Sequence, residues 1–263
     1  THEMEAEKMR NDFTSMMVHD LRSPLGNIKK IGEMMRTSKI LEDKQASSEY
    51  VTMLYDSSSS MLDLVNDLLD IAKLEAGKFS VEKSAVKIRE ILADRVKFFE
   101  TGAKDTGIDL RFNVGVGVPE VVSIDPKRIS QVLNNLISNA INYTPKGGSV
   151  TISSFIHKKE LNLADEASAT GNPWVTENMP SIAGNAVDSL VVAVTDTGEG
   201  ISTENIEKLF NKFTQFSSSI RCAKQAGEGL GLVIAKGIVD AHGCIIGVGS
   251  KQGTGSTFYF TLP

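Results

Sequence analysis

The sequence predicts an α-helical hairpin that dimerises into a four-helix bundle, followed by a mixed α/β domain. Residues 1–77 carry apolar side chains at helical spacing and contain a single proline, Pro24. From Phe79 the pattern changes to short strands rich in β-branched residues, alternating with amphipathic helices. Glycine clusters separate several of these later elements. We therefore expect two domains, residues 1–77 and residues 78–263.

Two apolar stripes, separated by a polar stretch at residues 37–48, define the hairpin. The first stripe comprises Met9, Phe13, Met16, Met17, Leu21, Ile28, Ile31, Met34 and Met35. The second comprises Val51, Leu54, Met61, Leu62, Val65, Leu68, Leu69 and Ala72. Gly77 stands where a helix C-terminal glycine belongs. Because two helices alone would leave both stripes partly uncovered, the sequence predicts a homodimer in which two hairpins pair.

The second part has the elements of a mixed sheet covered by helices. Helices are expected at residues 86–101, 125–142, 202–211 and 230–242. Strands are expected at residues 110–114, 150–156, 190–195, 244–250 and 256–261. Residues 158–189 form a long polar segment between two neighbouring strands, which we interpret as a mobile hairpin insertion without a catalytic role. Its lone Trp174 is either a docking anchor or a local packing contact.

Composition narrows the class of protein. The chain has 263 residues, 41% of them hydrophobic and 23% charged, with a net charge of -5. No basic stripe indicates nucleic-acid binding, and no run of 18 apolar residues indicates a membrane segment. The polar start resembles the middle of a helix, so we expect an upstream part, where a sensor or membrane region can lie. Cys222 and Cys244 lack metal-ligand spacing, which indicates free thiols and a cytoplasmic or other reducing location.

The first candidate for chemistry is His19, which faces away from the apolar stripe. A lone helical histidine is most often an ordinary surface residue. Here the adjacent Asp20 can orient the imidazole and take a proton from one ring nitrogen. Arg22 supplies a fixed positive charge, and Pro24 imposes a kink that costs about 3 kcal/mol in a helix interior. These neighbours favour a reactive histidine.

The second candidate is the helix at residues 131–145, in which Asn135 and Asn139 share one face at a spacing of four. Paired amides suit Mg²⁺ and phosphate oxygens, because Mg²⁺ takes few protein ligands and otherwise keeps water and phosphate. The alternative is a helix that is rich in asparagine by chance, or one that uses an asparagine as its C-terminal cap.

The third candidate is the set of glycine clusters at residues 196–201, 227–232 and 253–258. In the first, Asp196 ends a strand and can accept a hydrogen bond from an amino group such as that of adenine, while the glycines let a base approach the backbone. The second opens a helix whose free amides suit a polyphosphate. Each cluster alone could be only a turn, but three in this order after the asparagine helix are hard to explain as turns.

The order and spacing of these motifs resemble two-component sensor histidine kinases over almost the whole chain. Residues 19–24 are similar to the phosphoacceptor box, and residues 131–144 to the asparagine box. The other family boxes are matched by residues 196–200, 209–216, 227–231 and 253–255. The resemblance implies a dimerisation and phosphotransfer domain, then an α/β sandwich ATP-binding domain of the type shared with gyrase and Hsp90. It also implies that ATP phosphorylates His19, assisted by Asp20, and that the phosphoryl group then passes to an aspartate of a response regulator.

The resemblance further implies a set of ligand-binding residues. Asn139 would hold Mg²⁺, Asp196 would read adenine, and Thr257 would lie near the base. The full set of nucleotide-binding residues is Asn135, Asn139, Tyr143, Asp196, Gly198, Gly200, Ile201, Arg221, Lys224, Gly227, Gly229, Leu230, Gly231 and Thr257. Residues 217–228, which include Arg221 and Lys224, are expected to be a lid that orders over the triphosphate. The stretch Lys73–Lys83 is expected to be the hinge between the domains.

Two departures from the family pattern leave alternatives open. Asn142 stands where the family often has a lysine, so a degenerate kinase that binds nucleotide without phosphotransfer remains one alternative. Ser23 stands where many members have threonine or asparagine, which makes phosphatase activity toward the partner less certain than kinase activity. The other alternative is a gyrase- or chaperone-like ATPase, although that class explains neither the His19 box nor the phenylalanine-rich box at residues 209–216.

Overall fold

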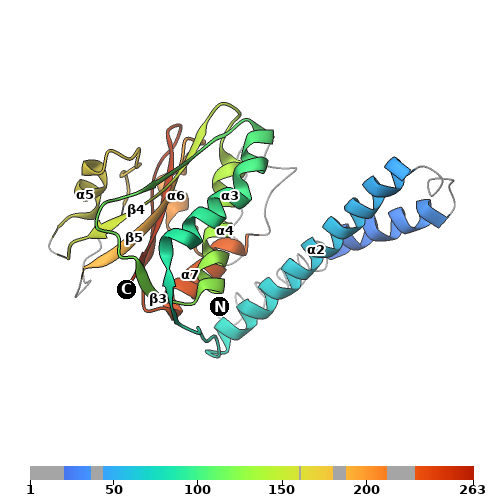
Figure 1. The fold of residues 1–263 in the computed structure, drawn as a ribbon, viewed down its shortest axis with the longest axis horizontal. Helices are drawn as coiled ribbons and strands as arrows, with labels where there is room; N and C mark the ends of the chain where they lie inside the picture. Colours follow the sequence, from blue (N-terminus) through green and yellow to red (C-terminus); the bar gives the residue numbers. More distant parts are fainter. Residues whose placement is uncertain (1–20, 37–43, 160, 180–187, 212–228) are drawn as a thin grey trace. The chain divides into compact units, whose positions relative to one another are not determined.

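The computed structural model describes residues 21–36, 44–159, 161–179, 188–211 and 229–263. The chain forms two compact units, Thr1–Gly77 and Lys78–Pro263, and each is considered by itself (Figure 1). His19 and Asp20 lie outside the described residues, and so does the predicted lid with Arg221, Lys224 and Gly227.

The described residues of the first unit are almost all helical, as predicted. Residues 21–36 are helical, and α2 spans Lys44–Glu75. Gly77 follows α2 with φ of +62°, a left-handed conformation that glycine adopts without strain. Ile31, Leu64 and Ile71 are buried in this unit. Much of the predicted second stripe stays exposed, namely Val51, Leu62, Val65 and Leu69.

The second unit is built on a five-stranded sheet with the strand order β2-β4-β5-β7-β6. The strands are β2 Asp109–Val114, β4 Ser149–His157, β5 Ser189–Asp196, β6 Ile246–Lys251 and β7 Gly255–Leu262. β2 pairs with β4 in parallel, and the other neighbouring strands are antiparallel. The helices α3 Ile88–Thr106, α4 Pro126–Tyr143 and α7 Gly231–Ala241 cover one face, here called the inner face (Figure 1). This arrangement confirms the predicted α/β sandwich.

The local sequence explains why α4 begins and packs where it does. Asp125 caps the helix by accepting the N–H of Arg128 at 3.1 Å, and Pro126 occupies the first turn, where its missing N–H costs nothing. The face toward the sheet consists of Ile129, Val132, Leu133, Leu136, Ile137 and Ala140, all buried. The apolar spacing predicted this face, and the asparagines lie beside it.

Several short elements differ from the prediction. Ser84–Lys87 forms β1, which pairs antiparallel with β3 Val121–Ile124, so α3 begins after this strand rather than at Val86. α6 is limited to Thr203–Ile206. The segment at residues 158–189, which was predicted to be a hairpin insertion, contains a helix in its described part, because Leu163–Ala169 forms α5. Elements this short carry too few residues for a period to be visible in the sequence.

Both units hold parts of the predicted hinge, Lys73–Lys83. α2 extends to Glu75, and the chain from Phe79 onward is held by the second unit. The Arg128 guanidinium lies 4.7 Å from the centre of the Phe79 ring, and the N–H of Glu82 donates to Asp125 at 2.9 Å. Lys83 Nζ donates to the carbonyl of His242 at 3.0 Å. The N–H groups of Ala76 and Gly77 donate to the carbonyls of Ala72 and Leu74, each at 3.1 Å, so the end of α2 holds these two residues. That this stretch acts as a hinge stays a prediction.

None of the helices in the described ranges has a stretch long and apolar enough to span a bilayer.

Candidate functional site

The second unit contains a cavity of about 500 Å³ between α4, the turn after β5 and the inner face of β7. This volume lies in the range of small-molecule sites. The cavity is lined by Asn139, Ala140, Tyr143, Asp196, Glu199, Gly200, Ile201, Ser202, Asn205, Leu209, Leu232, Gln252, Ser256 and Phe258.

Asp196 is the buried charge of this cavity. It ends β5 on the inner face, where the residue is only 4% exposed. Burial raises the pKa of its carboxyl to about 6, although the N–H groups of Gly198 and Ser256 act in the opposite direction. The Gly198 N–H donates to Asp196 Oδ1 at 2.8 Å. A buried acceptor of this kind favours a ligand that donates hydrogen bonds, such as an amino group.

The turn after β5 needs its glycines because the backbone passes very close to its neighbours. A Cβ on Gly198 would lie 2.4 Å from the carbonyl oxygen of Tyr143. Gly200 has φ of +66°, and a Cβ there would lie 2.0 Å from the carbonyl oxygen of Lys251. The turn is therefore wedged between the end of α4 and the β6–β7 turn, which places Gly200 and Ile201 in the cavity wall.

The opposite wall is formed by α4, where Asn139 and Tyr143 line the cavity one turn apart. Asn135, one turn earlier, donates its side-chain N–H to the carbonyl of Gly231 at 2.9 Å. It thus ties α4 to the first residue of α7. Because Leu232 in that first turn also lines the cavity, the N-terminal end of α7 lies at the cavity edge, where backbone N–H groups suit an anion.

The structure brings together most of the described residues that the sequence singled out. Five of them line the cavity: Asn139, Tyr143, Asp196, Gly200 and Ile201. Gly198 lies directly behind Asp196, and Asn135 contacts Gly231. Gly229 has φ of +69°, and Leu230 is buried immediately before α7. That these residues bind ATP stays a prediction.

Thr257 requires a correction. Its side chain does not line the cavity, because successive residues of a strand point to opposite faces and Thr257 points to the face away from α4. There its hydroxyl lies 3.0 Å from that of Thr195 and accepts the N–H of Val175 at 2.9 Å. The cavity is lined instead by its neighbours Ser256 and Phe258.

Other cavity residues were not singled out from the sequence. Ser256 pairs with Asp196 across β5 and β7, so strand parity would have identified it and Phe258. Leu209 lies in the phenylalanine-rich motif, which the sequence did single out. Asn205 and Gln252 come from a short helix and a turn, and no sequence signal pointed to them.

The donor set of the cavity restricts the kind of metal site that fits. Within the described ranges, no group of three or more His, Cys, Asp or Glu side chains is placed to hold a metal ion. The amide of Asn139 is suited to supply one ligand, with the remainder coming from water and phosphate oxygens, as is usual for Mg²⁺. The residues therefore fit a magnesium ion that arrives with a phosphorylated ligand.

Comparison with known proteins gives two family matches. Residues 124–263 match the histidine kinase-, DNA gyrase B- and HSP90-like ATPase family, and residues 9–77 match the His Kinase A (phospho-acceptor) domain. Similar curated proteins include the non-motile and phage-resistance protein of Caulobacter vibrioides, 31% identical over 98% of this chain and 27% of that protein. The sensor protein GacS of Pseudomonas syringae is 30% identical over 98% of this chain. This chain spans 25% of the length of GacS and 37% of that of the histidine protein kinase DivJ of Caulobacter vibrioides.

Solved structures show the same fold at lower identity. Full-length ShkA in complex with AMPPNP has a TM-score of 0.62 and 22% identity, over 96% of this chain and 45% of ShkA. The Acinetobacter baumannii histidine kinase AdeS has a TM-score of 0.60 and 20% identity, over 93% of this chain and 96% of AdeS. ThkA in complex with the response regulator TrrA has a TM-score of 0.59 and 23% identity, over 99% of this chain and 63% of that one.

Proposed function

The chain belongs to the sensor histidine kinase family, and from this premise we propose that it uses ATP to phosphorylate His19 and passes the phosphoryl group to an aspartate of a response regulator. The observation that carries this proposal is the cavity that joins the buried Asp196 to Asn139 on α4. At one end of the cavity, Asp196 is a buried hydrogen-bond acceptor for a base. At the other end, the amide of Asn139 and the N-terminus of α7 suit phosphates.

The first step is the binding of ATP. Asp196 would accept the amino group of adenine, and the Gly198–Ile201 turn would lie along the base. Asn135 and Asn139 would face the phosphates beside the start of α7. The predicted lid, with Arg221, Lys224 and Gly227, would supply positive charge to the triphosphate, and it lies outside the described residues.

The second step is phosphoryl transfer, which depends on positioning and charge neutralisation more than on covalent chemistry. A ring nitrogen of His19 attacks the γ-phosphorus while the bond to the bridging oxygen of ADP breaks, and Asp20 polarises the other ring nitrogen. Mg²⁺, with Asn139 as its protein ligand, would offset phosphate charge. The phosphoryl group then moves from His19 to the carboxylate of the response regulator.

The proposal includes a homodimer formed by the first unit. The exposed residues Val51, Leu62, Val65 and Leu69 of α2 leave an apolar surface that a second hairpin would cover. We expect no nucleic-acid partner, because the net charge of -5 does not favour phosphate backbones. Because the reaction consumes ATP, we expect it to occur in the cytoplasm.

Two other functions use the same cavity. A degenerate kinase would bind ATP without phosphorylating His19, and Asn142 in place of a lysine is the feature that favours it. A gyrase- or chaperone-like ATPase would need no phosphoacceptor histidine. The match of residues 9–77 to a phospho-acceptor domain favours the kinase over this second function.

The test is incubation of the wild-type chain with γ-labelled ATP, alongside His19→Gln. We expect acid-labile label in the wild type and none in His19→Gln, with ATP binding retained by both. Label that survives in His19→Gln would contradict the assignment of this histidine. Nucleotide binding without label in the wild type would identify the degenerate module.

A further inference from the structure

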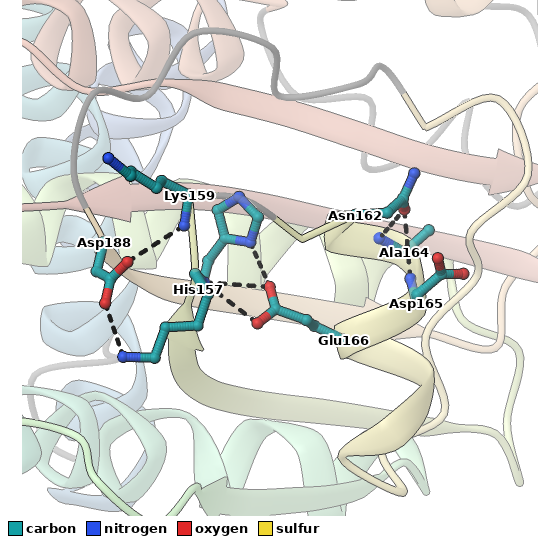
Figure 2. A network of polar contacts seen from close by, with 8 residues as sticks. His157, Lys159, Asn162, Ala164, Asp165, Glu166 and Asp188 are labelled. Carbon is teal, nitrogen blue, oxygen red and sulfur yellow. Dashed lines mark hydrogen bonds and ion pairs between the residues drawn. The ribbon is translucent and has the colours of Figure 1, made fainter.

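The face of the sheet opposite α4, here called the outer face, is covered by residues 161–179, here called the strap. The strap begins beside the end of β4, where Figure 2 shows its attachment. Asn162 caps α5 by accepting the N–H of Ala164 at 2.8 Å, and Glu166 contacts the imidazole of the buried His157. Leu163 and Ala167 of α5 pack in a buried cluster with Phe155, Val191, Ala193 and Tyr259.

Trp174 holds the middle of the strap against the sheet. Its ring stacks on Tyr259 with centroids 6.1 Å apart and meets the edge of Phe155 at 5.4 Å. Its indole N–H donates to Ser153 Oγ at 3.1 Å. Of the two interpretations of Trp174, the structure therefore shows the local packing contact.

The far end of the strap contacts β6 and β7 through its backbone. The N–H of Val175 donates to Thr257 Oγ1 at 2.9 Å. Gly249 leaves room for this segment, since a Cβ there would lie 2.2 Å from the carbonyl oxygen of Val175. The N–H of Ser250 donates to the carbonyl of Glu177 at 2.8 Å, and the Asn178 side chain donates to the carbonyl of Ser250 at 3.0 Å. The strap thus binds both backbone polar groups of Ser250.

Ser250 in turn holds the wall of the cavity. Its hydroxyl accepts the N–H of Ile201 at 2.8 Å and donates to the carbonyl of Gly255 at 2.9 Å. It also lies 2.9 Å from the hydroxyl of Ser256. Ile201 and Ser256 both line the cavity. A single buried residue therefore connects the strap on the outer face to the base-binding wall on the inner face.

We propose that the strap positions the base-binding wall of the nucleotide cavity, with Asn178 and Ser250 as positioning residues. This inference rests on the proposed function. The strap bonds the backbone N–H and C=O of Ser250 at the free edge of β6, so its displacement would leave the Ile201 turn less well ordered before ATP arrives. An ordered turn lowers the entropic cost of binding and thus raises ATP affinity. By reciprocity, bound ATP must favour the docked strap by the same factor.

Two variants release the strap from Ser250 by different routes. Gly249→Ala places a methyl group against Val175, and Asn178→Gly removes the amide while tolerating the φ of +59° at that position. Asn172→Ala is the matched control, because Asn172 belongs to the strap but bonds Asn113 at the other edge of the sheet. We expect about a three- to tenfold loss of ATP affinity in the first two, as for one hydrogen bond, and no loss in the control.

Two readouts separate positioning from general destabilisation. The KM for ATP should rise in Gly249→Ala and Asn178→Gly, while kcat at saturating ATP stays unchanged. Trp174 is the only tryptophan, so acrylamide quenching of its fluorescence reports strap docking directly. In both variants Mg-ATP should reduce the quenching.

The outcomes are distinguishable from failure of the proposed function. If the wild type does not bind ATP, the proposed function fails, and the inference that rests on it fails as well. If the wild type binds ATP but a variant with an undocked strap binds it equally well, the strap does not position the cavity. Equal quenching with and without Mg-ATP in a variant that binds ATP would also overturn the inference.

Discussion

The two faces of the sheet in the second unit are buried by different means. The inner face is mostly apolar and lies under the helices α3, α4 and α7 (Figure 1), and its buried polar residues Asp196, Ser250 and Ser256 lie at or beside the cavity. Its Ser154 hydroxyl is also buried without a hydrogen-bond partner among the described residues. The outer face is more polar and lies under the strap, with Ser153, Thr195, Thr257 and Thr261 all buried there. Its Thr151 hydroxyl, His157 Nε2 and Tyr259 hydroxyl are buried without a hydrogen-bond partner among the described residues. Each such atom costs about 1–3 kcal/mol.

The difference between the faces shows that a well-buried face is not always a strongly stabilised one. The long helices remove apolar side chains from water, which stabilises the fold strongly. The strap removes polar groups as well, and part of its gain is lost to those left unpaired. The strap should therefore be the cover that detaches first, although it contacts residues that hold the cavity wall.

The largest expected effect is a loss of stability, which a matched pair of Leu→Ala substitutions compares between the covers of the two faces. Leu136→Ala removes a fully buried side chain of α4, and Leu163→Ala removes a buried side chain of α5. We expect a loss in the free energy of unfolding of about 3–5 kcal/mol for Leu136→Ala and about 2 kcal/mol for Leu163→Ala, because the strap can relax around the change. Urea denaturation of both variants gives the comparison, and equal losses would show that the covers are equivalent.

The next effect concerns Asp196, the buried charge on the inner face. Asp196→Asn should weaken ATP binding by about tenfold to hundredfold, since a charge-assisted hydrogen bond contributes roughly 1.5–3 kcal/mol. The same change removes the cost of burying a carboxylate, so the empty domain should become more stable at neutral pH. Calorimetric titration measures the affinity, and thermal unfolding without ligand measures the stability. Unchanged affinity in the folded variant would remove Asp196 from the site.

The pH dependence of the empty domain should carry the signature of the same residue. Its pKa rises from 3.8 in the unfolded chain to about 6 in the folded one, so the folded state binds a proton more tightly. The contribution of Asp196 to stability is therefore present below about pH 4 and is lost as pH rises through about 6. ATP affinity should change in the opposite direction, falling as pH drops below about 6. Asp196→Asn should flatten both profiles between pH 4 and 7.

The smallest effect tests the unpaired groups of the outer face. Tyr259→Phe removes a hydroxyl that is buried without a partner among the described residues, while it keeps the ring beneath Trp174. We expect no loss of stability, or a gain of up to about 1 kcal/mol, because the unfavourable desolvation disappears. A clear loss in the free energy of unfolding, measured by chemical denaturation, would mean that the hydroxyl has a hydrogen-bond partner, for example an ordered water. The outer face would then carry one unpaired polar group fewer.

The sequence by itself determined the long elements and the site motif. The apolar spacing of α4 predicted its buried face, and the β-branched run predicted β5, because these patterns repeat over enough residues to be read locally. Asp196 and its glycines were identified because a strand followed by a glycine turn implies a close backbone approach, which the contacts of Gly198 and Gly200 show.

Only the tertiary structure decided the features that depend on distant parts of the chain. The strand register decided that Ser256, not Thr257, faces the cavity, because a shift of one residue exchanges the faces. Contacts with Arg128 and His242, far along the chain, decided that Phe79 and Lys83 are held by the second unit, although the sequence placed both in the predicted hinge. The strap covers the outer face because Gly249 leaves room for the backbone of Val175 and the N–H of Ser250 donates to the carbonyl of Glu177. Gly249 and Ser250 lie more than seventy residues after the start of the strap. The local sequence sets only the propensity of each segment for helix, strand or turn. The register, the contacts of Phe79 and Lys83 and the position of the strap depend on which distant residues the folded chain brings into contact.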